Sequence, residues 1–255
     1  MGSALLKGWL DRGVKSIQVV EPAPSAQLRK LAKAKKITLF AAPSLVKRKP
    51  LVCVVAVKPQ VLKGEAAALV GFAQGGALMI SIAAGTSIAA LTQAWGRKAR
   101  IIRAMPNTPG AVGQGITGIF AAKGVTGADR KRAASLLSAL GQTLWVAKEE
   151  LIDSVTAVSG SGPAYLFLMA EALTEAGIAE GLPRDQAEIF ARATVSGAGA
   201  LLAADKSSAS ALREAVTSPG GTTAAALYVL MAEDGLMALM KRAVRAARKR
   251  AEELR

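Results

Sequence analysis

The chain has 255 residues, of which 51% are hydrophobic, and it carries a formal net charge of +15 with one cysteine and no histidine. One cysteine excludes a disulfide within the chain, and the lack of histidine excludes Ser-His and Cys-His catalytic pairs and the usual zinc sites. No apolar run reaches the roughly 18 residues that a membrane span needs, and no targeting signal is visible, so we expect a soluble, cytoplasmic protein.

The first half of the chain alternates short apolar runs with segments of helical spacing. The predicted strands are Ile17–Val20, Thr38–Phe40, Leu51–Val57, Ala77–Ile82, Arg100–Ala104, Ile116–Phe120 and Thr143–Val146. The predicted helices between them are Ser25–Ala34, Val61–Gln74, Ser87–Trp95 and Ala128–Leu140. This alternation predicts a mostly parallel sheet wrapped by helices. The run Leu51–Val57 has no polar alternation, which predicts a strand covered on both faces.

The second half reads as helix throughout. Its predicted helices are Leu151–Val158, Ala164–Ala176, Pro183–Ala204, Ala209–Val216, Thr223–Ala232 and Leu236–Leu254. We therefore predict an α/β domain over residues 1–148 and an all-helical domain over residues 149–255. The long apolar helices exceed what one small core needs, which predicts burial against another subunit.

The positive charge would favour contact with polyanions, and this keeps a nucleic-acid binder among the alternatives. The densest basic stretch lies on the last predicted helix and comprises Lys241, Arg242, Arg245, Arg248, Lys249 and Arg250. Because the other face of that helix is apolar and the aromatic residues are few, we interpret the stretch as a solvated helix face. We therefore predict neither a nucleic-acid partner nor a membrane partner.

The start of the chain resembles the helix that follows a glycine-rich phosphate loop. Gly2 would be the last glycine of that loop, where a helix packs closely on a strand, and Ser3 follows in the helix. Glu21 comes about 19 residues later, close to the spacing of an acid that binds a ribose hydroxyl. An acid there disfavours the extra phosphate of NADPH, which makes NADH use plausible; the alternative for Glu21 is an exposed loop carboxylate.

Polar residues follow two of the predicted strands. Ala56-Val57-Lys58-Pro59-Gln60 closes one strand, and Asn107 follows another within Met105-Pro106-Asn107-Thr108-Pro109. Carboxyl ends of parallel strands meet at the edge of the sheet where ligands bind. Each segment alone is weak or moderate evidence, since Pro59 also simply ends a strand.

Two glycine-rich turns open helices in the second half. Ser159-Gly160-Ser161-Gly162-Pro163-Ala164-Tyr165 places proline at a first helical position, where the glycines permit close packing or admit a ligand. Ser218-Pro219-Gly220-Gly221-Thr222-Thr223 exposes backbone N–H groups at a helix start, which attracts a carboxylate. A capped turn is the alternative for the second segment.

These four motifs, in this order and spacing, resemble pyrroline-5-carboxylate reductase along nearly the whole chain. The resemblance implies an NAD(P)H-dependent oxidoreductase acting on a CH–NH bond, which reduces 1-pyrroline-5-carboxylate to L-proline in the last step of proline biosynthesis. It also implies a Rossmann-like nucleotide-binding domain and a helical dimerisation domain, assembled as a homodimer or a larger ring. Met1 aligns inside the family's glycine-rich loop, so we expect the first strand to be missing through a misplaced start or a partial sequence. Weak cofactor binding and reduced stability would follow.

The resemblance also implies residue roles. The cofactor, NADPH or NADH, is expected at Gly2, Ser3, Glu21, Ala56, Val57, Lys58, Pro59, Gln60 and Asn107. The substrate is expected at Ser218, Gly220, Gly221, Thr222 and Thr223, with Thr223 as the catalytic residue hydrogen-bonded to the ring nitrogen and no metal involved. The alternatives are a non-catalytic oligomeric remnant of the family and a related imine or hydroxy-acid reductase. A hydroxy-acid reductase would ordinarily need a catalytic lysine or histidine in the helical domain. The chain has no histidine, and Lys206, in a polar loop, is the only lysine between Lys148 and Lys241, so this alternative is weakened.

Overall fold

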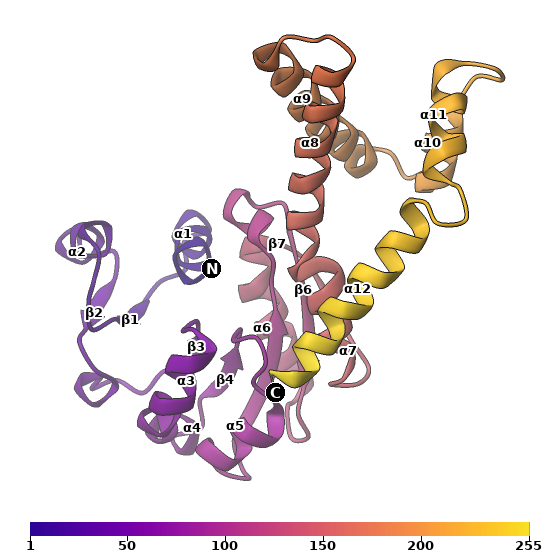
Figure 1. The fold of residues 1–255 in the computed structure, drawn as a ribbon. Helices are drawn as coiled ribbons and strands as arrows, with labels where there is room; N and C mark the ends of the chain where they lie inside the picture. The colour runs from indigo at the N-terminus through magenta and orange to yellow at the C-terminus, as the bar shows by residue number, and fades with distance from the viewer. Residues whose placement is uncertain (255) are drawn as a thin grey trace. The chain divides into compact units, whose positions relative to one another are not determined.

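The computed structural model of the chain describes residues 1–254, apart from the side chain of Lys63. The chain forms two compact units (Figure 1). One comprises residues 1–160 together with the end of the chain from Arg248, and the other comprises Ser161–Ala247. The domain boundary after Lys148 remains a prediction.

The first unit alternates strands and helices, which confirms the predicted α/β class. Its strands are β1 (Gln18–Val20), β2 (Thr38–Phe40), β3 (Val52–Val55), β4 (Leu78–Ser81), β5 (Arg100–Met105), β6 (Gly115–Ala121) and β7 (Gly141–Trp145). Its α-helices are α1 (Gly2–Asp11), α2 (Ala26–Lys33), α3 (Pro59–Glu65), α4 (Val70–Gln74), α5 (Ile88–Trp95), α6 (Gly127–Leu137) and α7 (Leu151–Val155). Short 3-10 helices lie at η1 (Pro43–Leu45), η2 (Ala66–Leu69), η3 (Thr108–Val112) and η4 (Ser138–Leu140), and a π-helix, η5 (Thr156–Gly160), continues α7.

The strands form two sheets in the described residues. β1 and β2 pair in parallel, and the five-stranded sheet has the order β3-β4-β5-β6-β7. Within the larger sheet only β5 and β6 pair antiparallel, so the predicted mostly parallel sheet is confirmed. β4 is buried at all of its positions, as expected of a strand with helices on both faces.

The prediction of a fully covered strand over Leu51–Val57 is wrong. Only Val52–Val55 pair with a neighbour, and only Val55 in this strand is buried, while Leu51 is 77% exposed. The reason is position, because β3 is an edge strand of the larger sheet and lacks a second neighbour in the described residues. β1 and β3 belong to different sheets and do not pair with each other in the described residues.

Helix α1 packs on both sheets. Its Leu5 belongs to a core with Leu78 and Ile102 of the larger sheet, whereas Leu6 packs with Ile17 and Ile37 beside the smaller one. Neighbouring helix positions point to different faces, which lets one helix serve two cores. The N-terminal helix is thereby fixed relative to the strand ends of this unit.

Most predicted helices are present, and their ends differ from the prediction by a few residues. The segment Val61–Gln74 is the clearest correction, because it consists of α3, η2 and α4 instead of one helix. Helix starts follow ordinary capping: the Ser25 and Ser87 hydroxyls accept from Leu28 N and Ala90 N. The predicted helix Leu151–Val158 ends its α-form at Val155 and continues as the π-helix to Gly160.

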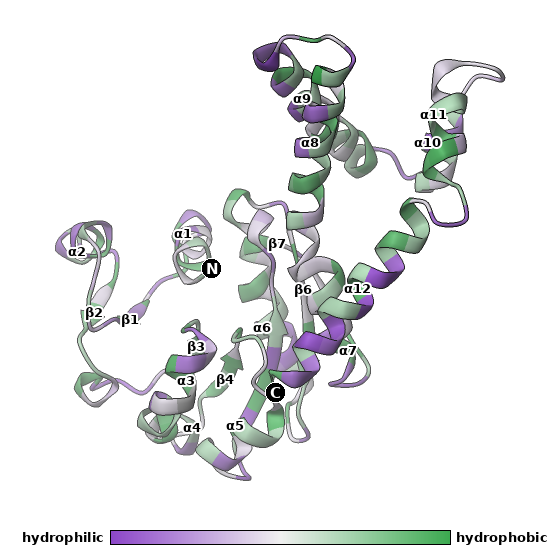
Figure 2. Cartoon of the chain, in the orientation of Figure 1, coloured by the Kyte–Doolittle hydropathy of each residue, from purple (hydrophilic) through white to green (hydrophobic). Residues whose placement is uncertain are grey.

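The second unit is helical, as predicted. Its helices are α8 (Gly162–Ala179), α9 (Arg184–Ala204), α10 (Ala209–Ala215), α11 (Thr222–Leu230) and most of α12 (Leu236–Glu253). α8 and α9 pack against each other. Figure 2 colours much of α11 as hydrophobic, and α12 is coloured hydrophilic along much of its C-terminal part.

None of the helices formed by residues 1–254 combines the length and apolar character that crossing a membrane would take.

Candidate active site

The N-terminus of α1 lies against the end of β3. A Cβ atom on Gly2 would lie only 3.2 Å from the Ala56 Cβ, so the small residue allows helix and strand end to approach closely. No side chain in the described residues caps the first turn of α1, and that turn contains no acidic residue. Uncapped N–H groups at a helix start are suited to an anion such as a pyrophosphate. Ser3 lies exposed in the same turn.

The residues after β3 lie exposed at the carboxyl end of the strand. Ala56, Val57, Lys58 and Gln60 are exposed, and Lys58 occupies the N-cap position of α3 with Pro59 at its first turn. Proline is favoured there because its missing N–H has no partner inside the helix. This strand end therefore offers backbone and side-chain groups to a ligand beside Gly2.

Asn107 lies in the loop after β5. Its Oδ1 accepts a hydrogen bond from Ile116 N at 2.9 Å, and its carbonyl accepts from Gly110 N at 3.1 Å. The 3-10 helix η3 that follows contacts α1. The fold thus places the Asn107 loop and the end of β3 beside the same helix.

Glu21 directly follows β1, on the smaller sheet. Its backbone N donates to Phe40 O at 2.9 Å, and its Oε1 accepts from Ala23 N at 3.1 Å. The second carboxylate oxygen can accept from a ribose hydroxyl. The residues of this unit therefore fit a dinucleotide chemically: an uncapped helix start for the phosphates and a carboxylate after the neighbouring strand for the ribose.

Cys53 lies in β3 and is partly buried. Burial raises the pKa of its thiol to about 12, which leaves almost no thiolate near neutral pH. Cys53 is therefore a packed side chain in β3 and not a nucleophile at neutral pH.

In the second unit, the glycine-rich turn leads directly into α11. Gly220 has a φ of +69°, and Gly221 is the N-cap of a helix that has no side-chain cap and no acid in its first turn. Gly221 N donates to Ser218 O at 3.0 Å, and a Cβ on Gly221 would clash with the Ser218 hydroxyl. Gly220 therefore suits its positive φ and Gly221 leaves room for the Ser218 hydroxyl. The first turn of α11 has no side-chain cap in the described residues, and uncapped N–H groups at a helix start are suited to an anion such as a carboxylate.

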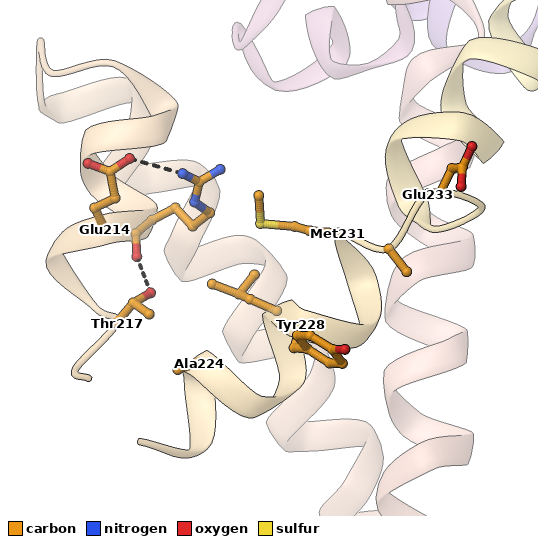
Figure 3. Close-up of a pocket in the computed structure, with 9 residues that line it drawn as sticks. Glu214, Thr217, Ala224, Tyr228, Met231 and Glu233 are labelled. Carbon is orange, nitrogen blue, oxygen red and sulfur yellow. Dashed lines mark hydrogen bonds and ion pairs between the residues drawn. The ribbon is translucent and has the colours of Figure 1, made fainter. Parts of the chain in front are cut away.

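A groove of about 670 Å³ lies between α10 and α11 of the same unit (Figure 3). Its lining is mostly apolar and includes Leu227, Tyr228 and Met231, and its Arg213 is paired with Glu214 at 3.0 Å. Tyr228 is 85% exposed. Within the described residues the groove offers no unpaired cation to a carboxylate, and its lining is mostly apolar. It is therefore better suited to packing against apolar side chains than to binding an anion.

Sequence reasoning gave no role to the charged cluster of Arg103, Glu149 and Asp153. Arg103 Nη1 and Nη2 donate to Glu149 Oε1 at 3.0 Å and Asp153 Oδ1 at 3.2 Å. The signal in the sequence was a lone arginine within the apolar run Ile101–Ala104.

The α/β unit, the helical unit and the two uncapped helix starts are those expected of a nucleotide-dependent oxidoreductase. Family models support both parts: the model for pyrroline-5-carboxylate reductase dimerisation matches residues 149–254, and that for NADP oxidoreductase, coenzyme F420-dependent, matches residues 1–85. A pyrroline-5-carboxylate reductase from Pseudomonas aeruginosa is 39% identical over 256 residues, covering 100% of this chain and 93% of its own length. The chain belongs to the pyrroline-5-carboxylate reductase family.

Solved structures agree with this assignment. The pyrroline-5-carboxylate reductase of Coxiella burnetii has a TM-score of 0.92 and 34% identity, with 99% of this chain and 94% of that chain covered. The Plasmodium falciparum pyrroline carboxylate reductase, crystallised with NADP bound, has a TM-score of 0.83 and 27% identity, with 100% and 94% covered.

Proposed function

We propose that this chain uses NAD(P)H to reduce 1-pyrroline-5-carboxylate to L-proline, the last step of proline biosynthesis. The observation that carries the proposal is the glycine turn Ser218–Thr223 at the uncapped start of α11, in a chain of this family. An imine bearing a carboxylate needs an anion site and a hydrogen-bonding group near its ring nitrogen. This turn supplies both from adjacent residues.

The dinucleotide is bound by the first unit. The α1 N-terminus, with Gly2 and Ser3, faces its phosphates, and Glu21 accepts from its ribose. Ala56, Val57, Lys58, Pro59, Gln60 and Asn107 line the nicotinamide half. A carboxylate at Glu21 repels a 2′-phosphate, so NADH is the preferred form.

The substrate carboxylate is held by the turn before α11. Ser218 supplies its hydroxyl, Gly220 and Thr222 supply backbone N–H groups at the positive end of the helix, and Gly221, whose N–H donates to Ser218 O, shapes the turn. Because Gly221 has no Cβ, the carboxylate can approach the backbone closely.

The Thr223 hydroxyl forms a hydrogen bond with the ring nitrogen, as donor to the neutral imine or as acceptor from the protonated one. The bound dinucleotide supplies a hydride to the imine carbon, and the nitrogen gains one proton, so that the imine becomes a secondary amine. A threonine hydroxyl of ordinary acidity orients and polarises the imine, while the proton comes from water or from an already protonated substrate.

The helical unit assembles as a homodimer or a larger ring. Its large apolar side chains are exposed in the single chain, among them Leu166, Phe167, Leu168, Ile189, Phe190, Leu201, Leu202, Tyr228, Val229, Met231, Met237 and Leu239. A second copy covering these side chains and the groove of Figure 3 would remove an apolar surface too large for a lone chain. A cytoplasmic location, with neither nucleic acid nor membrane as a partner, remains our prediction.

The test is loss of nicotinamide absorbance when the purified chain is mixed with 1-pyrroline-5-carboxylate, with NADH and NADPH tried separately. Turnover supports the reductase. A folded oligomer that binds neither cofactor nor substrate would contradict it and favour the non-catalytic remnant. Faster turnover of a 2-oxo acid would favour the hydroxy-acid reductase instead. The isosteric variant Glu21→Gln should raise NADPH use relative to NADH.

A further inference from the structure

Arg103 is a buried charge in the middle of the larger sheet. It lies in β5, paired in register with Ser81 of β4 and Phe120 of β6, and it is 1% exposed. Desolvating a guanidinium is costly, so a buried arginine requires specific partners. Its Nε has no hydrogen-bond partner in the described residues, which makes the two contacts of its other nitrogens all the more important.

Those two contacts reach the same helix start. Nη1 donates to Glu149 Oε1 at 3.0 Å, and Nη2 donates to Asp153 Oδ1 at 3.2 Å. Glu149 precedes α7, and Asp153 lies within it. Glu149 Oε1 also accepts from Ile88 N, at the start of α5, at 2.8 Å. One guanidinium thus ties β5 to α7 and, through Glu149, to α5.

The segment after Asp153 lies directly on the strands. A Cβ on Gly118 of β6 would lie 2.6 Å from Val155 Cγ1, and a Cβ on Gly160 would lie 2.8 Å from Met105 Cε. Met105 ends β5 and stands two residues before Asn107. The α7–η5 segment therefore packs against the strand end that carries the Asn107 loop, with Arg103 holding its near end.

We propose that Arg103 is a positioning residue for hydride transfer, which holds the α7–η5 segment on β5 and so fixes the Met105–Asn107 loop. The inference rests on the reductase function proposed above. A planar guanidinium shared by two carboxylates sets both angle and register, whereas a buried ion pair adds little to stability compared with apolar packing. Its value here is geometric, and a displacement of about 1 Å can slow a reaction on the order of 100-fold.

The variant Arg103→Lys keeps the charge but cannot engage both carboxylates in the same geometry. We expect kcat to fall by about tenfold. We expect the Kd for NADH to rise by about threefold at most, because Asn107 is displaced but still present and the phosphate and ribose contacts lie elsewhere. The deuterium isotope effect on kcat, measured with reduced cofactor labelled at the transferred position, should rise as hydride transfer becomes rate-limiting. A purely structural role would lower the melting temperature and leave the isotope effect unchanged.

Arg100→Lys is the matched control on the same strand. Arg100 pairs with Asp129 at 2.6 Å and with Gly76 O, at the opposite end of β5 from Met105. The Arg100→Lys variant should lower the melting temperature and leave kcat and the isotope effect at wild-type values. Glu149→Gln is a second variant that tests the positioning role, for use if Arg103→Lys does not fold. It should reproduce the fall in kcat, because it removes one charge from the same cluster.

Amide hydrogen exchange gives a readout that does not depend on turnover. Arg103→Lys should speed exchange at Gly110 N and Ile116 N, which the Asn107 loop protects, and leave α6 unchanged. Wild-type turnover and exchange in both Arg103→Lys and Glu149→Gln would overturn the positioning role. An inactive wild type would instead contradict the reductase function, and the exchange result would then decide the positioning role by itself.

Discussion

Asn107 Oδ1 accepts a hydrogen bond from Ile116 N at 2.9 Å, which joins the loop after β5 to the start of β6. With its oxygen used in this way, the amide has its NH₂ group left to donate. The same side chain can therefore hold the loop closed and bind the cofactor, and the two roles can be separated by mutation.

Asn107→Asp should keep the loop and lose the cofactor contact. The carboxylate still accepts from Ile116 N, but it cannot donate, and it brings a negative charge near an anionic ligand. We expect a melting temperature close to wild type and a Kd for NADH raised by about tenfold. Asn107→Ala, the comparison variant, should also lose about 1 kcal/mol of stability. Fluorescence titration measures the Kd for NADH, and thermal melting measures the stability. A wild-type Kd for NADH in Asn107→Asp would exclude a donor role for the amide.

Gly221→Ala should impair substrate binding selectively. The added methyl group would clash with the Ser218 hydroxyl and move it from the carboxylate site. We expect the KM for 1-pyrroline-5-carboxylate to rise by tenfold or more, on the order of the cost of one charged hydrogen bond. The KM for NADH should stay near wild type.

Gly181→Ala is the control for a general loss of stability. Gly181 has a positive φ of +95°, whereas Gly221 has a φ of −80°, and Gly181 lies between α8 and α9, where its added Cβ would meet no neighbouring atom within 4 Å. It should cost about 1 kcal/mol of stability without changing either KM. Equal effects of the two substitutions on substrate KM would mean that Gly221 acts only through stability.

Short-range patterns made much of the fold predictable. Each strand was predicted to within about two residues, because apolar runs such as Ile17–Val20 end at glycine, proline or polar residues. The break of Val61–Gln74 into three pieces was missed, since nothing in its alanine-rich composition favours a 3-10 segment at Ala66–Leu69.

Long-range relationships were not predictable. The exposure of Leu51 depends on which strand lies beside β3, and the two carboxylates that pair with Arg103 lie 46 and 50 residues away in the sequence. The glycine turn before α11 was recognisable because its requirements are local: Gly220 has a positive φ, and Gly221 leaves room for the Ser218 hydroxyl three residues earlier. The roles given to Glu21 and Thr223 remain predictions, which depend on ligand contacts.

Thr223→Val and Thr223→Ser separate shape from hydrogen bonding. Valine has the size of threonine without the hydroxyl, so kcat should fall by about 100-fold, within the usual range for a lost catalytic donor. Serine keeps the hydroxyl and should retain at least about a tenth of wild-type kcat. The Kd for NADH should be unchanged in both, because Thr223 lies in the helical unit. Stopped-flow absorbance measures the rates, and a fully active Thr223→Val would remove the hydroxyl from the mechanism.

Asp129 should make stability depend on acid pH. It is 1% exposed and begins α6 through a capping box with Thr126, and it also pairs with Arg100 at 2.6 Å. Burial alone would raise the pKa of Asp129, but the hydrogen bonds from Thr126 and Arg100 outweigh it and hold that pKa below its ordinary value. A carboxyl with a lowered pKa stabilises the fold fully above the ordinary value of about 3.9, and this stabilisation is lost as the pH falls through the folded-state pKa.

Asp129→Asn should therefore cost about 2 kcal/mol of unfolding free energy at pH 7, where the cap and the charged pair are both present in the wild type. The difference between variant and wild type should shrink as the pH falls below about 3.9, because the wild-type carboxyl then takes up a proton. Urea denaturation at pH 7 and in steps down to pH 3 measures both values. Asp11→Asn, which breaks the exposed pair with Lys7, is the control and should change the unfolding free energy at pH 7 by less than about 0.5 kcal/mol. A gap between Asp129→Asn and wild type that stays constant from pH 7 to pH 3 would show that Asp129 stabilises α6 without its charge.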